Sequence, residues 1–194
     1  MKHHRGRLEV ITGPMFCGKT DEMLRRLRRA IIAKQKIQVF KPGFDIRYSS
    51  EKVTSHAGNE YDACPIENIT EISALLLDHV TLIAIDEAQF FDEEIVTVVQ
   101  DLVDKGIRVI VGGLDMDFRG IPFGQMPLLL SQAEVVDKLH AICMVCGEQA
   151  TRTQRLVNGE PAYFDDPIII VGASEMYEAR CRIHHQVPRG KKGL

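Results

Sequence analysis

The sequence predicts an α/β fold in which helices flank a parallel β-sheet, followed by a small metal-binding module. Two observations carry this expectation. Apolar strand-like segments alternate with helix-like segments along residues 8–114, and that alternation is typical of parallel sheets. From residue 139 onward, short strand-like segments and turns surround two pairs of metal-ligand residues. We therefore expect one domain at residues 1–138, a second at 139–187 and a disordered tail at 188–194.

Length and charge limit the classes of function. The chain has 194 residues, enough for one domain of about 150 residues and a small second one. Its net charge of −3 gives no overall reason to bind nucleic acid or an anionic membrane. No apolar run approaches the ~18 residues of a membrane span, and residues 1–7 lack the apolar centre of a secretory signal. We therefore expect a cytoplasmic protein whose five cysteines are reduced.

The first predicted strand, residues 8–12, leads directly into a motif at residues 13–20 that is typical of a phosphate-binding loop. The alternative is an ordinary glycine-rich turn. In a phosphate-binding loop, backbone N–H groups contact the phosphates, the lysine reaches the terminal phosphates, and the last hydroxyl binds Mg²⁺. We therefore expect a nucleoside triphosphate and Mg²⁺ here. The loop consists of Gly13, Pro14, Met15, Phe16, Cys17, Gly18, Lys19 and Thr20.

The helix that begins in this loop is predicted at residues 19–34, where Met23, Leu27 and Ala30 recur at helical spacing. Its other face carries four arginines. They suit a phosphate or nucleic-acid patch, but a solvated or subunit-facing helix surface is the simpler interpretation, and we assign them no function. The four are Arg25, Arg26, Arg28 and Arg29.

After a short strand at residues 37–40, residues 45–60 are polar and without periodicity. A segment of this kind is either an active-site lid or an ordinary disordered loop. The sheet pattern then resumes. We predict a helix at 69–79, a strand at 81–85, a helix at 93–105 and a strand at 108–114.

Two adjacent carboxylates, Asp86 and Glu87, follow the apolar strand at residues 81–85. In phosphate-loop proteins an aspartate at this position holds Mg²⁺ together with the loop hydroxyl, here that of Thr20. Glu87 lies one residue further on and is the candidate general base, which takes a proton from an attacking hydroxyl or water. The alternative is a solvated acidic pair at a strand end.

Cys143 and Cys146 are separated by two residues, and so are Cys181 and His184. Two such pairs predict a closed, structural zinc site of three thiolates and one imidazole. The gap between the pairs exceeds the ~15–20 residues usual in zinc ribbons, which indicates an inserted loop. His185 is an alternative fourth ligand, and independent buried cysteines are the alternative to a site. Cys17 and Cys64 receive no metal role.

Taken together, these motifs resemble the type II thymidine kinases, the family of the cytosolic vertebrate enzyme and its bacterial relatives. Phosphate-loop proteins at large share only the first stretch and part of the third. The stretches that carry the resemblance are GPMFCGKT (13–20), DIRYSS (45–50), IDEAQFF (85–91), LDMDFRGIPFG (114–124), CMVC (143–146), TRTQRL (151–156) and VGASEMYEARC (171–181).

The resemblance implies transfer of the γ-phosphoryl group of ATP to the 5′-hydroxyl of thymidine, in a homotetramer that thymidine triphosphate inhibits. It makes Glu87 the base and brings Arg47, in the segment at 45–60, to the transferred phosphate. It further implies that a lasso loop at residues 168–177, carried by the zinc module, binds the thymine edge. The nucleoside-binding residues it implies are Met15, Phe90, Leu114, Phe118, Phe123, Thr153, Ile170, Val171, Gly172 and Tyr177.

His184 stands where many relatives have cysteine, which leaves the choice between His184 and His185 open; the two-residue spacing favours His184. A second hypothesis is a nucleic-acid-stimulated ATPase in which the zinc ribbon binds DNA or RNA. The acidic pI and the lack of clustered basic residues around the cysteines argue against it. A third, a nucleotide-dependent switch without a small-molecule acceptor, leaves Glu87 unexplained. We therefore expect no nucleic-acid or membrane partner.

Overall fold

The computed structural model describes residues 6–43, 52–54, 60–168 and 175–190. Its centre is a six-stranded sheet in which every neighbouring pair runs parallel, so the predicted α/β class is confirmed. In order across the sheet, the strands are β5 (Cys64–Ile66), β2 (Ile37–Pro42), β6 (Leu82–Ile85), β7 (Arg108–Gly113), β1 (Arg7–Thr12) and β8 (Val135–Lys138).

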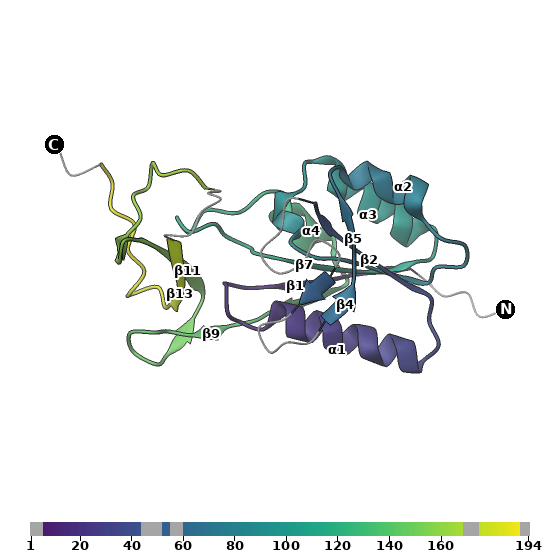
Figure 1. The fold of residues 1–194 in the computed structure, drawn as a ribbon, viewed down its shortest axis with the longest axis horizontal. Coiled ribbons are helices and arrows are strands. Elements are labelled where there is room, and N and C mark those ends of the chain that lie inside the picture. The colour runs from purple at the N-terminus through teal and green to yellow at the C-terminus, as the bar shows by residue number, and fades with distance from the viewer. Residues whose placement is uncertain (1–5, 44–51, 55–59, 169–174, 191–194) are drawn as a thin grey trace.

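Helices cover both faces of this sheet (Figure 1). Alternate strand residues point to opposite faces, so Leu8 and Val10 pack on one side while Ile11 packs on the other. The first side is covered by α3 (Glu94–Asp104), α4 (Met126–Gln132), the 3₁₀ turn η1 (Ile69–Glu71) and α2 (Ile72–Leu75). The second is covered by α1 (Lys19–Ile32). Burial on both faces explains why the strands read as continuous apolar runs.

The helix predicted at residues 69–79 is much shorter than expected. After η1, α2 ends at Leu75, and Leu76 is extended. The side-chain amide of Gln38 bonds to the backbone at the helix end. Its Nε2 donates to the carbonyl of Leu75 at 3.0 Å, and its Oε1 accepts the N–H of Leu77 at 2.9 Å. A side chain from β2 therefore stops a helix that the local sequence alone would continue.

Several elements were not predicted. Part of the segment at 45–60 is a strand, because β3 (Lys52–Thr54) pairs antiparallel with β4 (Glu60–Asp62). The helix α4 and the strand β8 were also missed. β8 pairs with β1 at the sheet edge, and its Val135 and Val136 are exposed, so it lacks the apolar pattern of a buried strand.

A small module follows β8 and lies at the carboxyl end of the strands (Figure 1). It contains two short antiparallel sheets. One pairs β9 (Ala141–Ile142) with β10 (Gln149–Ala150), and the other has β11 (Arg152–Val157) between β12 (Glu160–Pro161) and β13 (Glu175–Arg180). The main sheet ends at Lys138, and the division into domains there stays a prediction. None of the helices in the part of the chain that is described has the length and apolar character of a membrane span.

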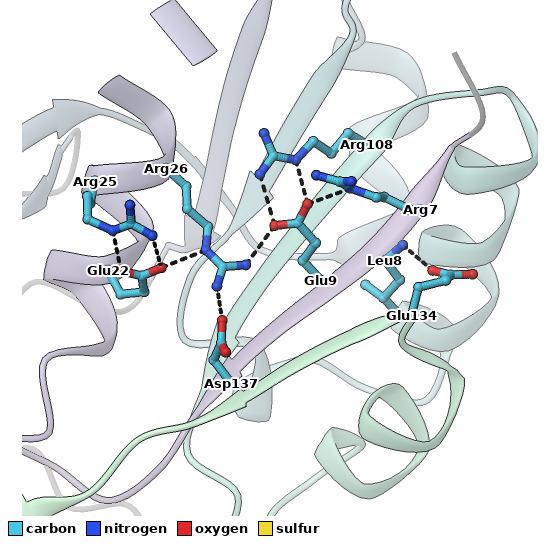
Figure 2. A network of polar contacts seen from close by, with 9 residues as sticks. All are labelled: Arg7, Leu8, Glu9, Glu22, Arg25, Arg26, Arg108, Glu134 and Asp137. Atoms are coloured by element: carbon cyan, nitrogen blue, oxygen red, sulfur yellow. Dashed lines mark hydrogen bonds and ion pairs between the residues drawn. The ribbon is translucent and has the colours of Figure 1, made fainter. Parts of the chain in front are cut away.

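A buried carboxylate joins the helix α1 to the sheet (Figure 2). Glu9 of β1 is 2% exposed, and its two oxygens accept hydrogen bonds from Arg26 of α1, at 2.6 Å, and from Arg108 of β7, at 2.6 and 2.9 Å. Arg26 also pairs with Asp137 of β8. The solvated-face interpretation of the four arginines is therefore wrong for Arg26, which is buried, whereas the other three are exposed.

Candidate functional site

The predicted phosphate and magnesium groups meet at one edge of the sheet. The loop at residues 13–20 follows β1, and Asp86 and Glu87 follow β6. Only β7 separates these two strands. Because all strands run parallel, both segments emerge at the carboxyl edge, where ligands of α/β proteins bind.

The phosphate-binding loop has the backbone conformation that its glycines predict. Gly13 has φ 139°, and a Cβ there would lie 2.4 Å from the carbonyl oxygen of Leu139, so no other residue fits. Gly18 is left-handed, with φ 85°, at the N-cap of α1. The ammonium group of Lys19 folds back onto the loop and donates to the carbonyls of Pro14, at 2.8 Å, and Gly13, at 3.3 Å. Backbone carbonyls of the loop therefore bind the ammonium group of Lys19.

The thiol of Cys17 points from this loop toward the module, where it packs against Ala141, Cys143, Ala150 and Ala179. Burial raises the pKa of the Cys17 thiol, which therefore stays protonated at neutral pH. All five cysteines are free thiols.

Asp86 is 8% exposed at the end of β6. Gly112 of the neighbouring strand β7 leaves space for this carboxylate, because a Cβ at that position would lie 3.0 Å from Asp86 Oδ1. The same Oδ1 accepts the backbone N–H of Glu87 at 3.0 Å. A carboxylate oxygen beside a phosphate-binding loop is the kind of ligand that Mg²⁺ prefers, so these residues fit the expected metal.

Glu87 adopts a left-handed backbone conformation, with φ 51°, which is costly for a residue with a side chain. The 3₁₀ turn η2 (Ala88–Phe90) follows it at once. Gln89 of this turn donates through Nε2 to Glu87 Oε2 and accepts the N–H of Leu114 at 2.9 Å. Sequence reasoning missed Gln89, and no spacing rule singles it out.

Three of the apolar residues expected around a nucleoside, Phe90, Phe118 and Phe123, make aromatic contacts. The rings of Phe90 and Phe123 meet edge to face, with centroids 5.4 Å apart and planes at 85°. The guanidinium of the fully buried Arg155 lies over the ring of Phe118 at 5.1 Å. Arg155 also donates to the carbonyl of Pro167. It thereby joins the wall of the expected pocket to the start of the lasso segment.

The module also touches the phosphate-binding loop directly. The hydroxyl of Thr153 on β11 accepts the backbone N–H of Met15 at 3.0 Å. Thr153 is buried and Tyr177 of β13 is partly buried. In the antiparallel register, Thr153 pairs with Ala179 and Arg155 with Tyr177. Two residues expected to contact the nucleoside therefore lie on adjacent strands of the module.

The two ligand pairs of the predicted zinc site come together, and the ligand atoms of Cys143, Cys146, Cys181 and His184 all lie within 4.8 Å of one another. The distance from Cys146 Sγ to Cys181 Sγ is 3.9 Å, and that from Cys181 Sγ to His184 Nδ1 is 3.3 Å. Tetrahedral zinc with bonds of ~2.3 Å to sulfur and ~2.0 Å to nitrogen requires about 3.8 and 3.5 Å. The cluster therefore suits zinc.

The backbone around Cys143 favours its thiolate form. Burial by itself would raise the pKa of the Cys143 thiol, but backbone N–H groups of Cys181, Val145 and Cys146 lower it to about 5. A thiolate is the form that binds metal. His184 supplies the imidazole. His185 instead places Nε2 2.8 Å from the carbonyl oxygen of Phe118, where only its N–H tautomer can donate.

Four predicted site residues lie outside the described part of the chain. They are Arg47, Ile170, Val171 and Gly172.

Comparison with known proteins adds two findings. A family model described as thymidine kinase matches residues 6–185. Among solved structures, the chain is similar to domain III of the replication initiation protein DnaA from Thermotoga maritima, with 15% sequence identity and a TM-score of 0.44. That match covers 70% of this chain and 55% of the other, so the chain spans about half of that structure. A likeness at this level carries no argument about function.

Proposed function

The protein belongs to the thymidine kinase family, and from this premise we propose that it transfers the γ-phosphoryl group of ATP to the 5′-hydroxyl of thymidine, giving thymidine monophosphate. One observation of the structure supports the proposal most strongly. The phosphate-binding loop and the pair Asp86–Glu87 emerge at the same sheet edge, with only β7 between their strands. A phosphate cradle, a metal-binding carboxylate and a base are therefore neighbours, as phosphoryl transfer requires.

Each group has a separate task in this proposal. The backbone N–H groups of residues 13–20 hold the phosphates, and Lys19 leaves the carbonyls of Gly13 and Pro14 to contact the terminal ones. Thr20 and Asp86 would hold Mg²⁺. When bound, the ion neutralises phosphate charge. Arg47 would contact the transferred group.

Glu87 takes the proton from the 5′-hydroxyl of thymidine. The 5′-oxygen then forms a bond to the γ-phosphorus while the bond from that phosphorus to the β,γ-bridging oxygen breaks, and ADP leaves. The edge-to-face pair Phe90–Phe123 supplies an aromatic surface suited to a flat base. Met15, Leu114, Phe118, Thr153 and Tyr177, with the lasso residues Ile170, Val171 and Gly172, would complete the pocket.

The zinc module would act indirectly, because it carries the lasso segment and supports the phosphate-binding loop through Thr153. Family membership further supports a cytoplasmic homotetramer inhibited by thymidine triphosphate. Sedimentation velocity tests the tetramer, and titration of the reaction with thymidine triphosphate tests the inhibition.

The decisive experiment is phosphoryl transfer from Mg·ATP to a panel of nucleosides by zinc-replete protein. Thymidine is compared with deoxyuridine, deoxycytidine, deoxyadenosine and deoxyguanosine. We expect selective phosphorylation of thymidine, and the deoxyuridine rate measures tolerance for the missing methyl group. If no nucleoside were phosphorylated by folded protein, the proposal would fail. ATP hydrolysis stimulated by DNA or RNA would then make a nucleic-acid-dependent ATPase the better explanation.

A further inference from the structure

We propose that Gln89 is a positioning residue for the reaction: its side-chain amide holds the carboxylate of Glu87 in the orientation needed to accept a proton. The inference rests on the proposed function, in which Glu87 is the general base. It extends that function to a side chain that touches neither ATP nor thymidine and acts only through Glu87.

The contacts of Gln89 form a short chain between two strands. Its Nε2 donates to Oε2 of Glu87, which follows β6, and its Oε1 accepts the backbone N–H of Leu114, which follows β7, at 2.9 Å. Gln89 itself is 2% exposed. Gln89 therefore links the carboxylate of Glu87 to the backbone of the neighbouring strand through its own buried side chain.

The backbone partner also determines which end of the amide faces Glu87. A peptide N–H can only donate, so the carbonyl oxygen of Gln89 must face Leu114. The NH₂ group then has to point at the carboxylate, to which it donates a hydrogen bond. A glutamine whose amide were free to turn would present donor or acceptor to Glu87. This one presents only the donor.

Two glycines provide the space that Gln89 occupies. A Cβ at Gly113 would lie 2.8 Å from Gln89 Oε1, and one at Gly124 would lie 2.3 Å from the backbone oxygen of Gln89. Gly124 has a positive φ of 50° as well. Both segments thus approach Gln89 more closely than any residue with a side chain would allow.

A base needs this restraint because its proton-accepting oxygen must stay within hydrogen-bond reach of the substrate hydroxyl. A glutamate side chain has several rotatable bonds. The backbone of Glu87 is held in a left-handed conformation, supported by the Asp86 carboxylate, and Gln89 holds the far end of the side chain. Both restraints limit where the carboxylate lies.

The test compares the steady-state kinetics of Gln89→Met, which keeps the side-chain length but removes both polar atoms, with the wild-type enzyme. We expect kcat to fall about 10- to 100-fold, the scale of a lost hydrogen bond to a charged group, while KM for thymidine and for ATP changes little. Gln89→Glu retains the acceptor for the Leu114 N–H but replaces the donor by a second carboxylate that repels Glu87, so its kcat should fall at least as far. The matched control is Gln100→Met, at a partly exposed glutamine of α3 that bonds Gln132, and it should behave as wild type.

A double-mutant cycle separates positioning from general structural support. In a Glu87→Gln background, Gln89→Met should cause no further loss, because its effect passes through Glu87. Losses that multiply would overturn the proposal, and so would failure of both Gln89 variants to fold. An unchanged kcat of Gln89→Met beside an active wild type would refute this inference alone. A wild type that phosphorylates no nucleoside would refute the proposed function instead.

Discussion

The backbone N–H of Met15 donates a hydrogen bond of 3.0 Å to the hydroxyl of Thr153, and this bond joins residues 138 positions apart. Met15 belongs to the phosphate-binding loop and Thr153 to the strand β11 of the metal-binding module. The loop contacts the chain after β8 at a second point, where Gly13 packs against the backbone of Leu139. The shape of the nucleotide-binding loop thus depends on the module that follows the sheet.

The first prediction removes this link. Thr153→Val keeps the side-chain shape but leaves the N–H of Met15 without its acceptor, which costs about 1–3 kcal/mol when the group is buried. We expect the Kd for ATP, measured by calorimetry without thymidine, to rise about 5-fold or more. Thr151→Val is the control, since Thr151 bonds only the neighbouring Arg152. Equal ATP affinities for both variants would mean that the loop does not need the module.

The second prediction concerns the base. Glu87→Gln preserves size and hydrogen bonding but cannot accept a proton, so kcat should fall about 100-fold or more. Binding of ATP should change little, because Glu87 is not expected to touch the phosphates. Stopped assays of thymidine monophosphate formation and calorimetric titration with ATP measure the two quantities. A variant with near-normal turnover would assign the base to another residue.

The third prediction separates two adjacent histidines. His184→Ala removes a member of the four-residue cluster, so zinc content by plasma emission spectrometry should fall well below one ion per chain, and the melting temperature should fall with it. His185→Gln should retain zinc, because His185 contacts the carbonyl of Phe118 instead. Zinc loss in His185→Gln with zinc retained in His184→Ala would reverse the assignment.

The fourth prediction is a loss of stability in acid. Burial alone would raise the pKa of Glu9, but hydrogen bonding to Arg108 and the charges of Arg108 and Arg7 bring it below its ordinary value. Hydrogen bonds from Arg25 likewise lower the pKa of Glu22 to about 2. A carboxylate whose folded pKa is depressed stabilises the protein above its unfolded pKa, and that stabilisation is lost as pH falls toward the folded value. Urea unfolding between about pH 5 and pH 2 should therefore show a steadily decreasing free energy of unfolding.

A substitution tests whether Glu9 contributes to this slope. Glu9→Gln removes the carboxylate that Arg26 and Arg108 share, although Arg26 keeps its pairs with Glu22 and Asp137, and it should destabilise the protein by about 1–3 kcal/mol at neutral pH. The acid-dependent loss should then be smaller than in the wild type. The exposed Glu160 provides the control, and Glu160→Gln should keep the wild-type slope. An unaltered slope in Glu9→Gln would exclude Glu9 as a source of the pH dependence.

Sequence reasoning succeeded where a signal is local and repeated. The strand β6 is a continuous apolar run, and α3 repeats its apolar residues at helical spacing, so both were predicted within about two residues of their ends. The cluster of three cysteines and His184 was predicted from the spacing of each pair, because chelation by a knuckle is itself a local property. The parallel sheet followed from the alternation of strands and helices.

The remaining features depend on contacts between distant segments. Gln38, on the strand β2, bonds to the end of α2, and Thr153, in the module, bonds to the loop at residues 13–20. Gln89 looks like an ordinary turn residue in the sequence, because its partner Leu114 is 25 positions away. The edge strand β8 has exposed valines and hence no buried pattern. No periodicity or spacing in the sequence encodes these contacts, because their partners become neighbours only after the sheet has formed.

The order of strands in the sheet has a consequence for biosynthesis. β1 is made first, yet both of its neighbours, β7 and β8, come from the second half of the chain; Thr12 bonds to Gly113, 101 positions later. The growing chain therefore carries an unpaired apolar strand until residues 108–138 leave the ribosome. Pairing across such separations is slow and leaves hydrophobic edges open to other chains. The loop at residues 13–20, though translated before residues 108–138, can thus take its final shape only after them, and nascent chains of this protein should need chaperone protection until then.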